Sequence, residues 1–127
     1  MLAFLQNRLA KDERVLFAYL HGSFLSDLPS RDLDLAVFFR DGLSAQENLA
    51  ACLSLQEEMS HSLGIPVDVH ALDPENLAFS FDALSGKLLF SRAEERRERF
   101  EERTIALFMD YKPMLKQILE DLTQSNR

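Results

Sequence analysis

The chain lacks the features that would place it in a membrane or in an oxidising compartment. It contains one cysteine, Cys52, so no disulfide can form within the chain, and such sparing use of cysteine is typical of the cytoplasm. No apolar run approaches the roughly 20 residues that a membrane-spanning helix needs. Residues 1–14 lack a basic segment followed by an apolar stretch, so we expect no signal peptide. We therefore expect a cytoplasmic protein that does not bind a membrane.

Positive charge is also scarce. The 127 residues include 14 lysines and arginines against 21 acidic residues, which gives a net charge of −7. A protein that binds nucleic acid broadly presents a basic face, so we expect no direct nucleic-acid partner. The length suits one hydrophobic core. Because the chain shows no repeat, low-complexity tract or linker, we expect a single domain over residues 1–127.

Hydrophobic periodicity and turn residues predict helices and strands in alternation. With their capping residues, the predicted helices cover residues 2–11, 44–64, 73–86 and 91–122, and the predicted strands cover residues 14–20, 32–39, 66–72 and 87–90. A short helical turn is expected after the first strand, and Pro113 is expected to kink the last helix. This order predicts an α/β (α+β) domain of about three layers.

Capping residues predict where three of these helices begin. Ser44 with Glu47, and Ser91 with Glu94, have the spacing of a capping box. Asp73 precedes a proline and is the predicted N-cap of the third helix.

Two aspartates stand at the start of the second predicted strand. Because side chains alternate along a strand, Asp32 and Asp34 should project to one face and Leu33 and Leu35 to the other. Two carboxylates so close together repel each other unless a cation lies between them. Ligand sets made of oxygen alone select a hard ion such as Mg²⁺ or Mn²⁺.

A third carboxylate stands in the third predicted strand. Val67 and Val69 should face the core, so Asp68 should point away from them. If this strand lies beside the second one, Asp68 can join the aspartate pair. Three aspartates around one or two ions form the arrangement used for metal-assisted phosphoryl transfer.

Gly22-Ser23 follows the first predicted strand. Gly22 lets the backbone approach a ligand closely, and the free N–H groups of the turn together with the Ser23 hydroxyl can bind an anion such as a triphosphate. This anion site and the aspartates would come from adjacent strands, so together they predict a nucleotide–metal site. His70 shares a face with Asp68 but is interpreted more simply as an ordinary polar residue, and His21 fits a packing role equally well.

The pattern formed by Gly22-Ser23, a spacer of eight residues, Asp32-x-Asp34 and the later Asp68 resembles the minimal nucleotidyltransferase (MNT) family of the polymerase-beta-like superfamily. The resemblance covers nearly the whole chain. It implies the nucleotidyltransferase fold, a small mixed four-stranded sheet flanked by helices with a long C-terminal helix. It also implies that the three aspartates are catalytic metal ligands for Mg²⁺ or Mn²⁺, that Gly22 and Ser23 bind the nucleotide, and that ATP is the substrate.

Small prokaryotic members of that family are antitoxins encoded beside a helical RNase, the HEPN toxin. The resemblance therefore implies an antitoxin that transfers AMP from ATP to a tyrosine of such a toxin and forms a homo- or hetero-oligomer. A second hypothesis is an antitoxin with a degenerate active site that neutralises the toxin by docking alone. The antitoxin branch commonly has a longer spacer with an early basic residue, so the residues that grip the triphosphate would be sought among Arg31, Arg40 and Lys87.

The last predicted helix has an apolar stripe longer than so small a sheet can cover. The stripe consists of Phe100, Thr104, Leu107, Phe108, Tyr111, Leu115, Ile118 and Leu122. We expect the stretch beyond Pro113 to overhang the sheet and to dock a helical partner or a second copy of the chain. The alternative is that this stretch folds back on the N-terminal helix.

Overall fold

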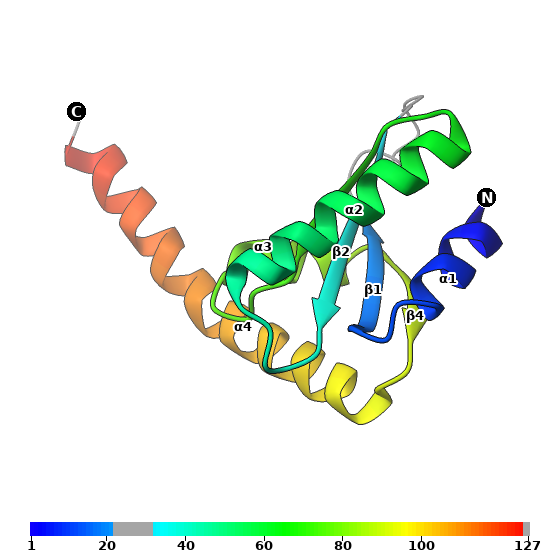
Figure 1. The fold of residues 1–127 in the computed structure, drawn as a ribbon. Coiled ribbons are helices and arrows are strands. Elements are labelled where there is room, and N and C mark those ends of the chain that lie inside the picture. The colour runs from blue at the N-terminus through cyan, green and yellow to red at the C-terminus, as the bar shows by residue number, and fades with distance from the viewer. Residues whose placement is uncertain (22–31, 126–127) are drawn as a thin grey trace.

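The computed structural model describes residues 1–21 and 32–125 (Figure 1). Its elements, in chain order, are α1 (Leu2–Ala10), β1 (Val15–His21), β2 (Leu33–Phe39), α2 (Ala45–Leu63), β3 (Val67–Ala71), α3 (Leu77–Leu84), β4 (Lys87–Ser91) and α4 (Glu94–Ser125). The predicted order of helices and strands is confirmed. The helical turn predicted after the first strand lies outside the described residues.

The four strands form one mixed sheet in the order β3-β2-β1-β4. β1 pairs antiparallel with both β2 and β4, whereas β2 pairs in parallel with β3. Parallel neighbours need a crossover connection, which α2 supplies. This pairing brings the C-terminal end of β1 and the N-terminal ends of β2 and β3 to the same edge of the sheet.

Helices cover both faces of the sheet, which gives the three layers that the sequence predicts. One face packs against α1 and α2 around a core that includes Leu5, Leu9, Leu35, Leu55 and Met59. The buried Cys52 belongs to this core, and burial raises the pKa of its thiol to about 11. The thiol therefore stays protonated at neutral pH and acts as a small apolar side chain.

The other face of the sheet is aromatic and packs against α3 and α4. The rings of Phe17 and Phe38 are stacked with centroids 4.6 Å apart, and the Phe100 ring of α4 lies 5.6 Å from the first and 5.4 Å from the second. Beside them the buried Tyr19 hydroxyl donates a hydrogen bond of 2.6 Å to Glu101 of α4. These contacts attach the first third of α4 to the sheet.

The ends of α2 follow the predicted capping signals. The Ser44 hydroxyl accepts a hydrogen bond from the backbone N–H of Glu47, and the Glu47 carboxylate accepts one from the backbone N–H of Ser44. Gly64 ends the helix with a left-handed φ of 71°, a conformation that glycine adopts without strain. Both predictions for this helix are confirmed.

The predicted start of α3 at Asp73 is wrong. The Asp73 carboxylate accepts a hydrogen bond from the backbone N–H of Glu75 and so closes a turn before the helix. Asn76 is the N-cap, since its side chain accepts a hydrogen bond from the backbone N–H of Phe79. An aspartate before a proline suits a turn as well as a cap, and here a second capping residue follows it.

The predicted capping box at Ser91 is also wrong. Ser91 is the last residue of β4 and lies opposite Phe17 in the sheet. The first turn of α4 instead has the backbone N–H of Arg97 bonded to the carbonyl oxygen of Ala93. Pairing within the sheet therefore keeps Ser91 in β4, although the local sequence pattern assigns it to the start of the helix.

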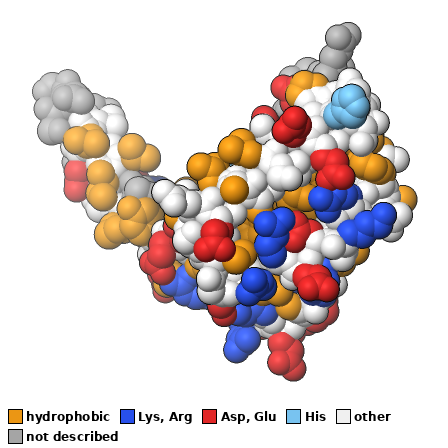
Figure 2. Space-filling view, viewed as in Figure 1, with side chains coloured by type: hydrophobic (Ala, Val, Ile, Leu, Met, Phe, Trp, Pro, Cys, Tyr) orange, Lys and Arg blue, Asp and Glu red, His pale blue; other side chains and the backbone are white. Residues whose placement is uncertain are grey.

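Helix α4 projects beyond the body of the molecule. It has 32 residues and continues through Pro113, and its orange and red parts extend away from the sheet on the side opposite α1 (Figure 1). The expected overhang is confirmed, and the alternative of folding back on the N-terminal helix is wrong. Figure 2 shows apolar side chains along this arm, and its exposed members are Met109, Tyr111, Met114, Ile118, Leu119 and Leu122.

Among the helices of residues 1–21 and 32–125, none is long and apolar enough to span a membrane.

Gly86 allows β4 to approach the end of β1. A Cβ atom at this position would lie 2.2 Å from the carbonyl oxygen of Leu20 and 3.0 Å from the Cα of His21. We therefore expect Gly86→Ala to push the strands apart and to lower the free energy of unfolding by about 2 kcal/mol or more, measured by urea denaturation. Gly64→Ala is the control, because a Cβ there meets nothing within 4 Å and should cost only about 1 kcal/mol through its left-handed backbone. Equal losses in the two variants would contradict the role of close packing at Gly86.

Candidate active site

The strand register places two aspartates side by side at one edge of the sheet. Asp34 of β2 lies opposite Asp68 of β3, and on its other side it lies opposite His21, the last residue of β1. Paired residues on neighbouring strands project to the same face of a sheet. These three side chains therefore share the face that α3 and α4 cover.

His70 joins this pair of carboxylates. It follows Asp68 by two residues on β3, so the alternation of side chains keeps it on the same face. One ligand atom each from Asp34, Asp68 and His70 lies within 4.8 Å of the other two. Asp34 is half-buried, whereas Asp68 and His70 are exposed. Two carboxylate oxygens and one imidazole nitrogen at this spacing fit a single divalent cation.

An open hollow of about 580 Å³ lies beside this cluster. The sheet edge contributes one wall and α3 with its N-cap contributes the other; the lining residues are His21, Asp34, His70, Ala71, Asn76, Phe79 and Asp82. The Phe79 ring meets the rings of His21 and His70 edge-on, at centroid distances of 5.4 Å and 6.1 Å. A planar ring and a group of carboxylates thus share one solvent-accessible space.

The His21 side chain is the buried polar group of the hollow. It is 8% exposed, and its Nδ1 atom lies 3.4 Å from a carboxylate oxygen of Asp82. Neither of its ring nitrogens has a hydrogen-bond partner within the described part of the chain. Buried polar groups in folded proteins almost always have such a partner, so the imidazole of His21 is available to a polar ligand.

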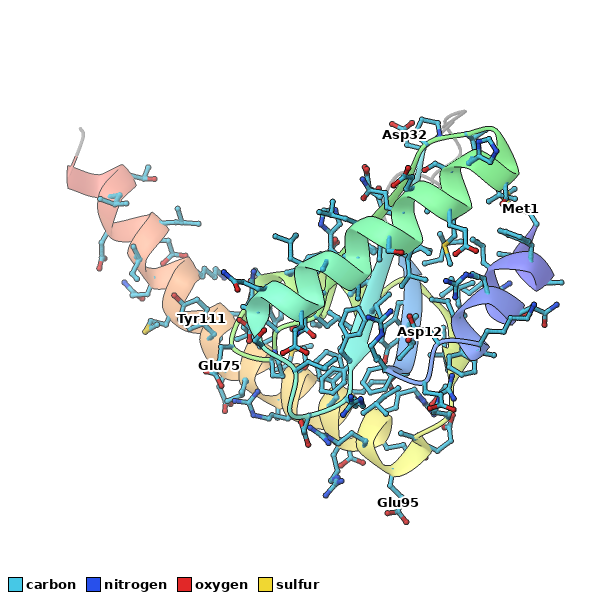
Figure 3. The ribbon with its side chains drawn as sticks, in the orientation of Figure 1. Met1, Asp12, Asp32, Glu75, Glu95 and Tyr111 are labelled. Atoms are coloured by element: carbon cyan, nitrogen blue, oxygen red, sulfur yellow. The ribbon has the colours of Figure 1, made fainter. Side chains whose placement is uncertain are left out.

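Other predicted site residues lie outside this cluster or outside the described residues. Asp32 is exposed and lies one residue before β2 (Figure 3), and it is not part of the group whose ligand atoms lie within 4.8 Å of one another. Gly22 and Ser23, the predicted nucleotide-binding residues, lie outside the described residues, as does Arg31.

The two remaining candidates for gripping a triphosphate lie at opposite ends of the sheet. Lys87 lies opposite Leu20, next to the site edge. Arg40 follows the far end of β2, roughly 20 Å from Asp34 at about 3.3 Å per strand residue. At that distance the Arg40 side chain does not reach a triphosphate bound at the aspartates.

Sequence reasoning missed the part of the site that α3 supplies. Its residues Phe79 and Asp82, together with the N-cap Asn76, carry no motif that marks them, because only the packing of the helix brings them to the sheet edge. A signal for His70 did exist in its spacing of two residues from Asp68, although the residue was interpreted as an ordinary polar one.

Solved structures resemble the chain over nearly its whole length. A chain of the structure of tri-AMPylated Shewanella oneidensis HEPN toxin in complex with MNT antitoxin is 21% identical, with a TM-score of 0.69, and the match covers 97% of this chain and 99% of that one. A chain of a toxin–antitoxin structure with AMP-PNP is 20% identical, with a TM-score of 0.67 and coverage of 92% and 94%. A chain of the toxin–antitoxin MntA-HepT is 18% identical, with a TM-score of 0.65 and coverage of 95% and 94%. These similarities establish a shared fold.

No curated protein matches the chain. The family model described as polymerase beta, nucleotidyltransferase, matches residues 4–95. That span is most of the chain, and it includes the sheet and all three predicted aspartates. The mixed sheet with helices on both faces and the paired aspartates at its edge agree with this match, and the chain belongs to the polymerase beta nucleotidyltransferase family.

Proposed function

We propose that this chain is the antitoxin of a HEPN–MNT pair and that it transfers AMP from ATP to a tyrosine of its partner RNase toxin. The observation that carries the proposal is the pairing of Asp34 with Asp68 at the edge of a nucleotidyltransferase sheet. Two solved structures of the same fold add support, since one contains a tri-AMPylated HEPN toxin and another contains AMP-PNP, an ATP analogue.

A divalent cation fits the cluster at the sheet edge. Asp34 and Asp68 would hold it, and Asp32 would reach the same site from the start of β2. Carboxylates in register repel one another, and a cation between them removes that repulsion. Oxygen ligands of this kind suit Mg²⁺ or Mn²⁺. When bound, the cation would offset the negative charge of the triphosphate during transfer.

The proposed transfer is a displacement at the α-phosphorus of ATP. The tyrosine oxygen of the toxin forms a bond to that phosphorus while the bond to the oxygen that bridges to the β-phosphate breaks, and pyrophosphate leaves with the electron pair. The hydroxyl proton passes to the carboxylate of Asp68, which is exposed and can meet an incoming side chain. Gly22 and Ser23 would bind the phosphates through backbone N–H groups and the hydroxyl.

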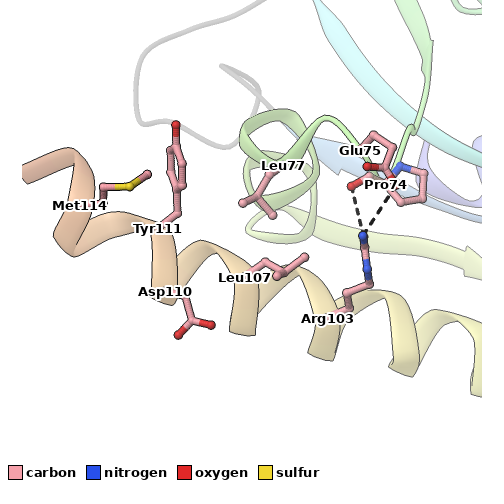
Figure 4. A pocket seen from close by; sticks show the side chains of 8 residues that line it. All are labelled: Pro74, Glu75, Leu77, Arg103, Leu107, Asp110, Tyr111 and Met114. Atoms are coloured by element: carbon pink, nitrogen blue, oxygen red, sulfur yellow. Dashed lines mark hydrogen bonds and ion pairs between the residues drawn. The ribbon is translucent and has the colours of Figure 1, made fainter. Parts of the chain in front are cut away.

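The overhanging part of α4 provides a surface for the helical partner. Its exposed apolar side chains continue into a groove between the start of α3 and α4 (Figure 4), lined by Pro74, Glu75, Leu77, Arg103, Leu107, Asp110, Tyr111 and Met114. Arg103 holds one end of this groove, since it donates a hydrogen bond of 3.3 Å to the carbonyl oxygen of Pro74 and lies 3.7 Å from the Glu75 carboxylate. An apolar helix face beside a groove suits an amphipathic helix of another protein.

The first prediction for the site concerns nucleotide binding. Replacing Asp32 and Asp34 together by asparagine should abolish the binding of Mg-ATP, because the neutral amides cannot hold the cation. The fold should stay intact or become slightly more stable, since like charges are removed. Titration calorimetry with Mg-ATP checks the first outcome and thermal unfolding the second. Unchanged affinity for Mg-ATP in the double variant would eliminate the proposed metal site.

The second prediction concerns the transfer itself. The chain is mixed with Mg-ATP and with the HEPN-type toxin that the proposal expects to be encoded beside it, and mass spectrometry counts the AMP groups on the partner. We expect AMP on a tyrosine of the partner, and we expect Asp68→Asn to lower the rate by about 100-fold or more while it changes ATP binding far less. Equal losses of rate and binding would make Asp68 a simple ligand. A partner that is silenced without any AMP would show the alternative, an antitoxin that acts by docking alone.

The third prediction concerns docking. Ile118 is 46% exposed on the apolar face of the overhang, so Ile118→Glu should weaken the complex with the toxin by about tenfold or more without unfolding the chain. Gln117→Glu is the control for the added charge at the neighbouring position, and thermal unfolding of both variants accounts for the hydrogen bond that the Gln117 amide donates to Asp121. Deletion of residues 114–127 should likewise leave a folded chain that no longer copurifies with the toxin. Full-strength copurification of the truncated chain would show that the overhang is not the docking surface.

A further inference from the structure

We infer that His70 is a nitrogen ligand of the cation in the active site, so that the site prefers a divalent transition-metal ion such as Mn²⁺ over Mg²⁺. The inference rests on the proposed function, because it assumes that a cation binds at Asp34 and Asp68. It goes beyond that function in naming a ligand outside the aspartate pattern and in assigning a class of metal.

The geometry places the His70 ring where a ligand belongs. A ring nitrogen of His70 and a carboxylate oxygen each from Asp34 and Asp68 all lie within 4.8 Å of one another. Asp32, which the sequence pattern offers as a ligand, is not part of this group. An imidazole would therefore join the two carboxylates around the cation, whether or not Asp32 also reaches it.

His70 can bind a metal, because among the described residues no hydrogen bond or ion pair holds its ring nitrogens. The residue is exposed, and its ring has an edge-on contact with Phe79 at 6.1 Å and 82°. That contact orients the ring and leaves its polar atoms available. The strand itself fixes the position of the backbone, since His70 lies opposite Ala36 in the parallel pair.

The buried imidazole of His21 gives an independent indication that a polar ligand occupies this space. Its side chain is 8% exposed and its Nδ1 atom lies 3.4 Å from the Asp82 carboxylate, yet neither ring nitrogen makes a hydrogen bond among the described residues, and Nε2 has no such contact. It lines the same hollow as Asp34 and His70. A hydrated cation or its bound ligand in the hollow would supply the missing partner.

The ligand set decides the preference for the metal. Mg²⁺ binds oxygen ligands in strict octahedral geometry and retains several of its waters. Imidazole nitrogen is a softer ligand that suits transition-metal ions, whereas carboxylates alone suit Mg²⁺, Ca²⁺ and Mn²⁺. Because Mn²⁺ is the one transition-metal ion among these three and also accepts carboxylate oxygens, two carboxylates with one imidazole should bind Mn²⁺ more tightly than Mg²⁺.

Pulsed electron paramagnetic resonance tests this directly, with Mn²⁺ alone added to the full chain and no nucleotide present. We expect a ¹⁴N coupling from a directly bound imidazole in the wild-type chain, lost in His70→Asn. Loss of a ligand should also weaken Mn²⁺ binding by about tenfold or more while Mg²⁺ binding changes less, since even residues that only support metal ligands typically contribute about 10- to 100-fold. His61→Asn is the control, because His61 is an exposed histidine on α2 that lies outside the hollow.

Each other outcome overturns the inference. Bound Mn²⁺ without a nitrogen coupling would exclude His70 as a ligand and leave the proposed function standing. A coupling lost in His21→Asn but kept in His70→Asn would identify His21, not His70, as the nitrogen ligand. Absence of Mn²⁺ binding to the wild-type chain would overturn the inference, whereas the proposed function is tested separately by the transfer of AMP to the partner.

Discussion

The parallel pairing of β2 with β3 holds two like charges together at the edge of the sheet. Asp34 and Asp68 are opposite each other, and a carboxylate oxygen of each lies within 4.8 Å of the other, so their like charges repel. The remainder of β2 outweighs this, because residues 35–39 are all buried and each large apolar side chain contributes about 1.5–3 kcal/mol. The hydrophobic cores on both faces of the sheet thus maintain an arrangement that the two aspartates alone would oppose.

The walls of the site depend on the close contact between Gly86, which follows α3, and the end of β1. Helix α3 contributes Phe79 and Asp82 to the hollow, and the chain passes from this helix through Gly86 directly into β4. Because Gly86 lies against Leu20 and His21 of β1, the end of α3 is tied to the strand that carries the buried imidazole. The hollow therefore keeps its shape through backbone packing as well as through side-chain contacts.

Much of the fold was predictable from the sequence, because the spacing of apolar residues in β2, β3 and α2 matches the side of each element that is buried. The errors occurred where two local signals compete: Asp73 closes a turn while Asn76 caps the helix, and Ser91 stays in its strand. For the site, the alternation within each strand predicts which face an aspartate occupies, but only the register shows that Asp34 and Asp68 are neighbours. The contribution of α3 was not predictable in this way, since it depends on how a helix packs across the sheet.

The position of α3 relates the proposed docking surface to the proposed site. This helix has eight residues, which makes it roughly 12 Å long. One side of it, with Phe79 and Asp82, faces the hollow, while Leu77 lines the groove against α4. A helical partner bound in that groove would lie across a single short helix from the carboxylates. Under the proposed function, the helix that shapes the hollow would thereby limit the distance over which a tyrosine of the docked partner must reach, and this would favour transfer to the bound toxin over transfer to other proteins.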